Sequence, residues 1–444
     1  MRRPAQAGWP RRSGRTGRLE RVAGRVGCAR LAALALAATL AACRVSGPPP
    51  VVRVDLPDDE PMVRVGIVVD ATDVTVGSTG DFEIGEPGRD PAVRARGGES
   101  WTFAADDAGR VVVRGPDGRR VGPFAGPVRV RPRSDNASIL INRTPYRGGA
   151  LVRSAGPGRV TAINVVALEE YLLGVVPLEI GPRPAEEIEA VKAQAVAART
   201  YAISHIGGRE SLGFDFYATV ADQVYGGRER ENDVVSRAVR ETRGEILMYR
   251  GAPILAYYHS TCGGRTAAID EVWRHAPVPY LKSVSDRIPG KDAYYCETSN
   301  RFRWTERWTG EALRNLLSRT LRENGRSAEP LRRIEMVEAR GRTPSGRVAS
   351  LRVVADGREF VVATPDSIRR VLQPERGRWL NSARFTLEVE RRGGEVTGVV
   401  ATGGGWGHGI GMCQMGAIGR ARAGQDYRRI LRTYYRDTEI VKLY

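Results

Sequence analysis

The sequence predicts an α+β fold, in which a β-rich scaffold is packed with helices and preceded by a small β-rich N-terminal domain. Three observations predict it. Short apolar runs broken by Gly, Asp and Pro fill the region after residue 62, a long helical pattern follows, and strand-like runs return near the C-terminal end. The chain has 444 residues, of which 41% are hydrophobic, so it can hold two or three domains with real cores. Its slightly negative mean hydropathy excludes a polytopic membrane protein.

Residues 1–42 are predicted to be a secretory signal peptide. Residues 2–30 contain nine arginines and one acidic residue, and the apolar run at 31–42 is too short to span a bilayer comfortably. The run ends in Leu-Ala-Ala-Cys, which is similar to a bacterial lipobox, so we expect Cys43 to be lipidated. A plain signal peptide with an incidental cysteine is the alternative. The expected protein is exported and anchored to the membrane of the cell envelope, in the periplasm if the cell is Gram-negative.

Export changes the set of partners that a basic chain can meet. Removal of the signal peptide lowers the formal net charge from +18 to +10. The anionic partners outside the cytosol are phospholipid headgroups, lipopolysaccharide and peptidoglycan carboxylates, and nucleic acid is not expected. A generic solvated surface is the alternative interpretation of this charge.

The chain divides by composition. Residues 43–61 are rich in proline and acid and are predicted to be a tether that follows the lipidated cysteine. Residues 62–135 are predicted to form the small β-rich domain, which holds no obvious catalytic cluster. Residues 136–444 are predicted to form the main domain, with an insertion at about 300–380.

Within the main domain, the clearest helix is predicted at 185–206. Pro184 stands at its start, two glutamates occupy its first turn, and apolar residues follow the helical repeat until Gly207 ends it. We also expect helices that start at residue 302 and that cover 366–373, 412–423 and 427–435, the last capped by Asp426, and strands at 334–340, 347–355, 384–392, 396–403 and 439–444.

Glu179 is the first candidate for catalysis. It follows an apolar run that we expect to be a strand ending at Pro177, and Gly181 then breaks the chain before the long helix. Desolvation in such an apolar turn raises the pKa of a carboxyl group and makes it a better proton donor near neutral pH. The alternative is an ordinary solvated acid at a strand end.

A second candidate is a cysteine–histidine cluster. His259 and Cys262 are three residues apart, a spacing that can chelate a metal. Cys296 would be the third ligand of a structural zinc, and water or another side chain the fourth. A disulfide between Cys262 and Cys296 and a set of free thiols are the alternatives, and an exported protein permits the disulfide.

The glycine-rich stretch at 403–417 is the third candidate. It lacks the Gly-Lys-Ser/Thr of a phosphate-binding loop, so nucleotide binding is not expected. Trp406 can stack on the apolar face of a sugar, and His408 and Gln414 can bond to hydroxyl or amide groups. Close packing between strand and helix is the alternative role of these glycines. Cys413 with His408 is a weak candidate for a nucleophile–base pair, since nothing marks a third orienting group.

Several stretches match one family in the same order. They include LEEYLLGVVPLEIG, EAVKAQAVAARTYA, ADQVYGG, YYHSTCGGRT and GGGWGHGIGMCQMGAIGRA. The chain resembles the stage II sporulation protein D / amidase-enhancer LytB family (the SpoIID domain) over about 140–444, most weakly at 300–380.

The resemblance implies an exported lytic transglycosylase, which cleaves the bond between N-acetylmuramic acid and N-acetylglucosamine and forms a 1,6-anhydro end. It implies Glu179 as the catalytic acid and base, because this residue falls on the glutamate of the family's Val-Val-Pro-Ser-Glu-Met motif. No cofactor is required for this chemistry. The substrate-binding residues that we expect are Tyr201, Gln223, Tyr225, Trp406, His408 and Gln414.

The alternative that the family name implies is a non-enzymatic module, which binds glycan and stimulates an N-acetylmuramoyl-L-alanine amidase. Expected partners are glycan strands, the membrane through the lipid, and a cell-wall amidase. The chain departs from the family at Leu178 and Ile180 beside the glutamate and at Cys413 and Met415 in the glycine-rich stretch. Some relatives carry zinc near the Gly-Gly turn, which the cysteine–histidine cluster matches only in part.

Overall fold

The computed structural model describes residues 58–374, 377 and 379–444. The predicted signal peptide, the predicted lipidation site Cys43 and most of the predicted tether lie outside these residues. The described chain mixes helices with several sheets, so the predicted α+β class is confirmed. In this part of the chain, no helix has both the length and the apolar character that a membrane crossing requires.

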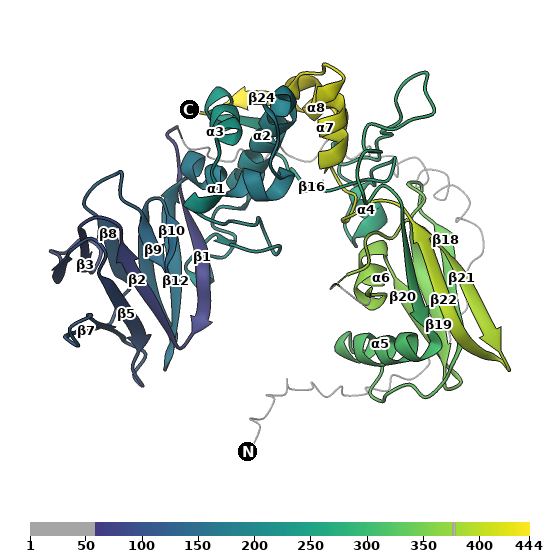
Figure 1. Ribbon diagram of the computed structural model, residues 1–444, viewed down its shortest axis with the longest axis horizontal. Coiled ribbons are helices and arrows are strands. Elements are labelled where there is room, and N and C mark those ends of the chain that lie inside the picture. Colours follow the sequence, from purple (N-terminus) through teal and green to yellow (C-terminus); the bar gives the residue numbers. More distant parts are fainter. Residues whose placement is uncertain (1–57, 375–376, 378) are drawn as a thin grey trace, which may run out of the picture. The chain divides into compact units, whose positions relative to one another are not determined.

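Two sheets that share one hydrophobic core form the N-terminal half (Figure 1). Alternate residues of their strands are buried, as in β8, where two fully buried valines alternate with two exposed arginines. The larger sheet has the order β13 (Phe216–Tyr217), β1 (Met62–Ala71), β12 (Arg159–Ala167), β11 (Gly149–Gly156), β8 (Val128–Pro132), β3 (Phe82–Gly85) and β4 (Val93–Ala95). The smaller has the order β10 (Thr144–Tyr146), β9 (Ile139–Ile141), β2 (Asp73–Ser78), β5 (Ser100–Ala105), β6 (Val111–Arg114) and β7 (Arg120–Phe124).

These sheets join segments that the sequence analysis separated. β1 and β8 lie before residue 135, yet they pair antiparallel with β12 and β11, which lie after it. In the smaller sheet, β2 pairs with β9 in the same way. The expected boundary at residue 135 therefore runs through both sheets.

The predicted strand before Glu179 is wrong, because residues there form helix α1 (Leu168–Ile180) with Pro177 inside it. An internal proline costs a helix about 3 kcal/mol. Five apolar residues of α1 nevertheless recur at the helical spacing i, i+3, i+4, i+7 and i+8, and all five are buried. They are Leu168, Tyr171, Leu172, Val175 and Val176. Packing of this stripe outweighs the cost of the proline.

The predicted helix at 185–206 is confirmed as the short 3₁₀ turn η1 (Ala185–Glu187) followed by α2 (Ile188–His205). α2 is buried on almost every side rather than along one stripe, since α1, α3 (Asp233–Glu241) and later elements surround it. One of its charged residues, Arg199, is fully buried and forms a bidentate ion pair with Glu169 of α1, with both nitrogen–oxygen distances at 2.7 Å.

The C-terminal elements pack around α2. Asp426 caps the last helix through a 2.7 Å bond from the Arg429 N–H, as predicted. The elements of this region are η2 (Glu210–Leu212), η3 (Arg228–Arg230), β14 (Glu245–Tyr249), β15 (Ala252–Pro253), β16 (Tyr258–His259), α4 (Ile269–Val272), β23 (Met412–Cys413), α7 (Gln414–Arg422), α8 (Tyr427–Tyr434) and β24 (Glu439–Lys442).

A second hydrophobic core lies in the segment where the insertion was expected. It reaches from Trp304 to Ala401 and so continues past residue 380. The helix expected from residue 302 starts at Gly310, because the residues before it pair with β22. The elements are β17 (Trp304–Thr309), α5 (Gly310–Glu323), β18 (Ile334–Arg342), β19 (Val348–Ala355), β20 (Arg358–Ala363), α6 (Pro365–Val371), β21 (Phe385–Arg392) and β22 (Glu395–Gly403).

Candidate active site

The proline in α1 shapes the position of Glu179. A helix proline leaves a carbonyl oxygen of the preceding turn without a helical partner. In α1 this is the carbonyl of Leu173, and next to it the Gly226 N–H donates to the carbonyl of Gly174 at 3.2 Å. Glycine at 174 permits this approach, because a Cβ there would lie 2.6 Å from the Tyr225 ring. The segment that precedes η3 therefore lies across the last turns of α1.

This segment supplies a donor to the candidate acid. The Val224 N–H donates to Oε1 of Glu179 at 3.0 Å. The side chain of Gln414, the first residue of α7, favours the charged form of the carboxyl group. Gln414 is buried and donates from Nε2 to Oε1 of Gln194 on α2 at 3.3 Å. Three elements thus hold one half-buried carboxyl group.

Burial dominates the electrostatics of Glu179. Desolvation raises its pKa to about 7, while the Val224 N–H and the Gln414 amide favour the charged form and limit the rise. The carboxyl group is therefore close to half protonated at neutral pH. It can release a proton and take one back without a large free-energy cost, which is what an acid and base in one reaction needs.

Two of the predicted substrate-binding residues lie in the core behind Glu179. Gln223 is 1% exposed, accepts from the Tyr171 hydroxyl at 3.3 Å and donates to the Tyr258 hydroxyl at 2.9 Å. Tyr225 is 5% exposed, and its hydroxyl donates to Oδ1 of Asn164 at 2.9 Å. The hydrogen-bonding groups of both side chains already have partners within the protein. In this position they support the residues around Glu179 and do not face a substrate.

A cavity of about 650 Å³ opens beside this cluster. Two predicted residues, Tyr201 and His408, line it. Glu179 does not, but residues 220–222 of the lining lead directly to Val224, which bonds to Glu179. The remaining lining residues are Thr219, Tyr257, Tyr258, Trp273, Asp366, Arg369, Arg370 and Trp379.

His408 acts in this cavity as a neutral side chain. Its Nδ1 accepts from the Ile410 N–H at 3.0 Å, so the ring proton resides on Nε2. Burial, with a contribution from the positive charge of Arg369, lowers the pKa of His408 to about 3. The imidazole can orient a ligand but does not supply a positive charge at neutral pH.

A second cavity of about 380 Å³ extends the first. Trp406 lines it, and the two cavities share Val220, Arg369 and Trp379. We call the combined lining of the two cavities the groove. Trp406 and Trp379 expose 47% and 40% of their surfaces, and the guanidinium groups of Arg301 and Arg370 lie 5.3 and 4.5 Å from the respective ring centroids.

The groove contains residues that sequence reasoning missed. Trp379, Arg369 and Arg370 follow or belong to α6, in the segment where the resemblance is weakest, so no motif pointed to them. The sequence signal that could have indicated this part of the groove is Trp379, which follows several arginines in the same short segment. Asp222 was also missed, and its carboxylate is held by Arg209 at 2.8 Å and by the Tyr217 N–H at 2.9 Å.

The three predicted metal ligands are not the three closest donors. His259 is buried, its Nδ1 lies 3.1 Å from the Ile410 carbonyl oxygen, and its Nε2 has no hydrogen-bond partner among the described residues. Cys262 and Cys296 are thiols with their sulfur atoms 3.4 Å apart, longer than a disulfide bond of about 2 Å. The buried group whose donor atoms all lie within 4.8 Å of one another consists of Cys262, Asp286, Cys296 and Cys413. Three thiols and a carboxylate suit a structural zinc ion.

Two stretches of the chain match known protein families. Residues 157–249, which contain Glu179 and α2, match a family described as stage II sporulation protein. Residues 288–411 match a family described as a domain of unknown function.

Relatives extend the match over most of the chain. The stage II sporulation protein D of Bacillus subtilis is 31% identical over 69% of this chain and 85% of its own length. An uncharacterized protein of Brachyspira hyodysenteriae is 35% identical over 63% of this chain and 68% of its own length. The amidase enhancer of Bacillus subtilis is 31% identical over 61% of this chain but only 40% of its own length.

Proposed function

Because the chain belongs to the stage II sporulation protein D family, we propose that it is a lytic transglycosylase of peptidoglycan. A peptidoglycan-associated role in the cell wall follows from the family. The reaction is our proposal: cleavage of the bond between N-acetylmuramic acid and N-acetylglucosamine with formation of a 1,6-anhydro end. The observation that carries it is the half-buried carboxyl group of Glu179, whose pKa is raised to about 7.

One carboxyl group suffices for both proton transfers. Protonated Glu179 donates its proton to the glycosidic oxygen as the bond from that oxygen to the anomeric carbon breaks. The resulting carboxylate then takes the proton of the C6 hydroxyl, and the C6 oxygen bonds to the same anomeric carbon. The acid is regenerated, the product carries the anhydro ring, and no water enters. A second carboxylate to activate water is therefore not needed.

The surroundings of Glu179 support this sequence of steps. The Val224 N–H and Gln414 stabilise the carboxylate formed by the first transfer, while burial makes that carboxylate basic enough for the second. The nearby Asp222 is engaged by Arg209 and by a backbone N–H, so it is a poor candidate for a second acid or base.

The groove supports a glycan substrate. Exposed Trp406 and Trp379 offer flat apolar faces to sugar rings, and Tyr201 and His408 add polar edges. The arginines beside the tryptophans would attract the carboxylates of stem peptides. We further propose that the protein is exported and held to the membrane by a lipid on Cys43.

The second candidate function is stimulation of a cell-wall amidase without catalysis. It is favoured by one observation, the similarity to a relative named amidase enhancer. In that case the groove would bind glycan for a partner enzyme, and Glu179 would contribute nothing to the reaction rate.

One digestion separates the two functions. Purified peptidoglycan, with and without stem peptides, is incubated with the wild-type protein and with Glu179→Gln, and the products are analysed by mass spectrometry. We expect anhydro-muramyl ends from the wild type and none from the variant. The matched control is Glu170→Gln on the same helix, whose carboxylate forms a 3.5 Å ion pair with Arg147 and should be dispensable. If neither the wild type nor Glu179→Gln forms anhydro-muramyl ends, and both accelerate an amidase equally, the enhancer function replaces our proposal.

A further inference from the structure

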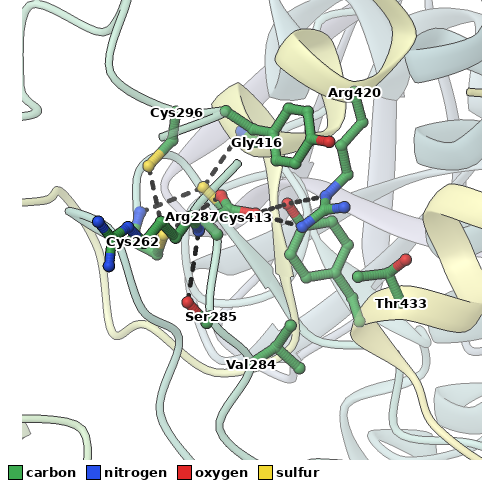
Figure 2. Close-up of polar contacts among 12 residues, drawn as sticks. Cys262, Val284, Ser285, Arg287, Cys296, Cys413, Gly416, Arg420 and Thr433 are labelled. Atoms are coloured by element: carbon green, nitrogen blue, oxygen red, sulfur yellow. Dashed lines mark hydrogen bonds and ion pairs between the residues drawn. The ribbon is translucent and has the colours of Figure 1, made fainter. Parts of the chain in front are cut away.

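Four buried donor side chains converge from segments far apart in the sequence. Cys262 follows β16, Asp286 and Cys296 lie in the loop between α4 and β17, and Cys413 ends β23. In Figure 2 the sulfur atoms of the three cysteines turn toward one another, with Arg420 on one side of the group. Cys262, Cys296 and Asp286 are each 0% exposed, as is Cys413.

Backbone N–H groups point at the sulfur atoms. Gly264 N–H donates to the Cys262 sulfur at 3.3 Å, and Cys262 N–H donates to the Cys413 sulfur at 3.2 Å. Cys413 also caps α7, where its sulfur accepts from the Gly416 N–H at 3.3 Å. Donors at a helix N-terminus stabilise a thiolate much more than a neutral thiol. These N–H groups therefore suit sulfur atoms that become thiolates when they bind a metal ion.

Asp286 is oriented by its neighbours. Its Oδ1 accepts from Arg420 at 2.9 Å and from the Tyr434 hydroxyl at 2.7 Å. Its Oδ2 lies 3.4 Å from the Cys262 sulfur and faces the thiols. Gly416 makes this possible, since a Cβ there would collide with Oδ2. One oxygen held by outer partners and the other directed inward is the usual arrangement of a ligating carboxylate.

We propose that Cys262, Cys296, Cys413 and Asp286 form a closed structural site for one zinc ion. Three thiolates and one carboxylate supply the four ligands of a tetrahedral site, and the softness of the thiolates selects zinc over magnesium or calcium. The positive charge of Arg420 offsets part of the excess negative charge. The set differs from the predicted one, because Cys413 and Asp286 replace His259.

The site has a structural consequence for the groove. It joins the loop before β17, the turn at Gly264 and the first turn of α7. Gln414, the residue after the ligand Cys413, favours the charged form of the Glu179 carboxyl group. The ion therefore fixes the helix that positions the candidate acid. The site itself does not depend on which reaction Glu179 catalyses.

Metal analysis tests the ligand set directly. The full chain is purified under reducing conditions, and its zinc content is measured by inductively coupled plasma mass spectrometry. We expect about one zinc per chain, and a loss of at least about tenfold in Cys413→Ser and in Asp286→Asn. The matched control is His259→Gln, which should keep its zinc. Loss of zinc from this control with retention in Cys413→Ser would overturn the proposed ligands.

A measurement on the unaltered sequence guards against variants that fail to fold. The zinc is replaced by Co²⁺, and the absorption spectrum is recorded. Tetrahedral coordination by thiolates gives strong sulfur-to-cobalt charge-transfer bands together with visible d–d bands. A protein that takes up no Co²⁺ in this form refutes the site. So does a protein purified without reductant whose thiol titration in denaturant shows a disulfide between two of the three cysteines.

Discussion

The raised pKa of Glu179 predicts that Glu179→Gln makes the protein more stable at neutral and alkaline pH. The replacement keeps the shape of the side chain but cannot ionise. In the wild type, the carboxyl group must lose its proton inside the protein, where burial raises its pKa from 4.5 to about 7. A group whose pKa is raised on folding contributes stability that is fully present below the unfolded pKa and is lost as the pH rises through the folded pKa.

The magnitude follows from the two pKa values. A shift of the pKa from 4.5 to about 7 lowers the unfolding free energy of the wild type by about 2.5 kcal/mol between pH 5 and pH 8. Because part of the side chain stays in water, we reduce this loss to about 2 kcal/mol. The glutamine variant loses nothing through this residue. The difference between the variant and the wild type should therefore grow by about 2 kcal/mol over this range.

Urea unfolding of both proteins at pH 5, 6, 7 and 8 measures this difference directly. Ionisation of every other group is common to both proteins and cancels in the comparison. Glu170→Gln serves again as the control, and its difference from the wild type should stay constant with pH. Parallel stability curves for wild type and Glu179→Gln would refute the desolvation argument, and with it the basis for Glu179 as an acid at neutral pH.

Four further predictions follow. Glycan cleavage should fall about tenfold per pH unit above pH 7, because the acid must be protonated in the free enzyme, and a flat kcat/KM profile to pH 9 would contradict this. Trp406→Ala and Trp379→Ala should each weaken binding to purified glycan strands by about 1 kcal/mol in sedimentation assays, whereas unchanged binding would remove the groove from the substrate path. Gly174→Ala should lower the unfolding free energy by about 1–3 kcal/mol, because its Cβ meets the Tyr225 ring, and an unchanged melting temperature would argue against this contact. Cys43→Ser should shift the protein from the membrane to the soluble fraction, and continued membrane partition would exclude lipid anchoring.

The sequence revealed those parts of the fold whose signals are local. The long helix α2, the cap at Asp426 and the C-terminal strand were predicted because each rests on neighbouring residues. The helix that carries Glu179 was missed although its apolar spacing was present in the sequence. Pro177 predicts the end of a strand, but burial of the stripe around Tyr171 and Val175 outweighs the cost of the proline in the helix.

Other features depend on contacts that no local pattern records. Cys413 lies 151 residues from Cys262, and Asp286 carries no motif, so spacing alone favoured the nearer His259 as a ligand. Gln223 and Tyr225 belong to a family motif. The motif indicates that these residues have a role, but it does not indicate whether their side chains face a substrate or the core. The burial and hydrogen bonds of their side chains decide in favour of the core.

The glycine-rich stretch illustrates how a motif can act through the protein's own packing. The alternatives were glycines that make room for a glycan and glycines that make room for a neighbouring segment. A Cβ at Gly411 would collide with the Tyr257 carbonyl, and one at Gly409 would enter the guanidinium group of a buried arginine. The glycines therefore admit protein atoms, while Trp406 and His408, each of which stands between two glycines, line the groove. Substitution of these glycines should act first on folding, and any loss of glycan binding should follow from the displaced Trp406.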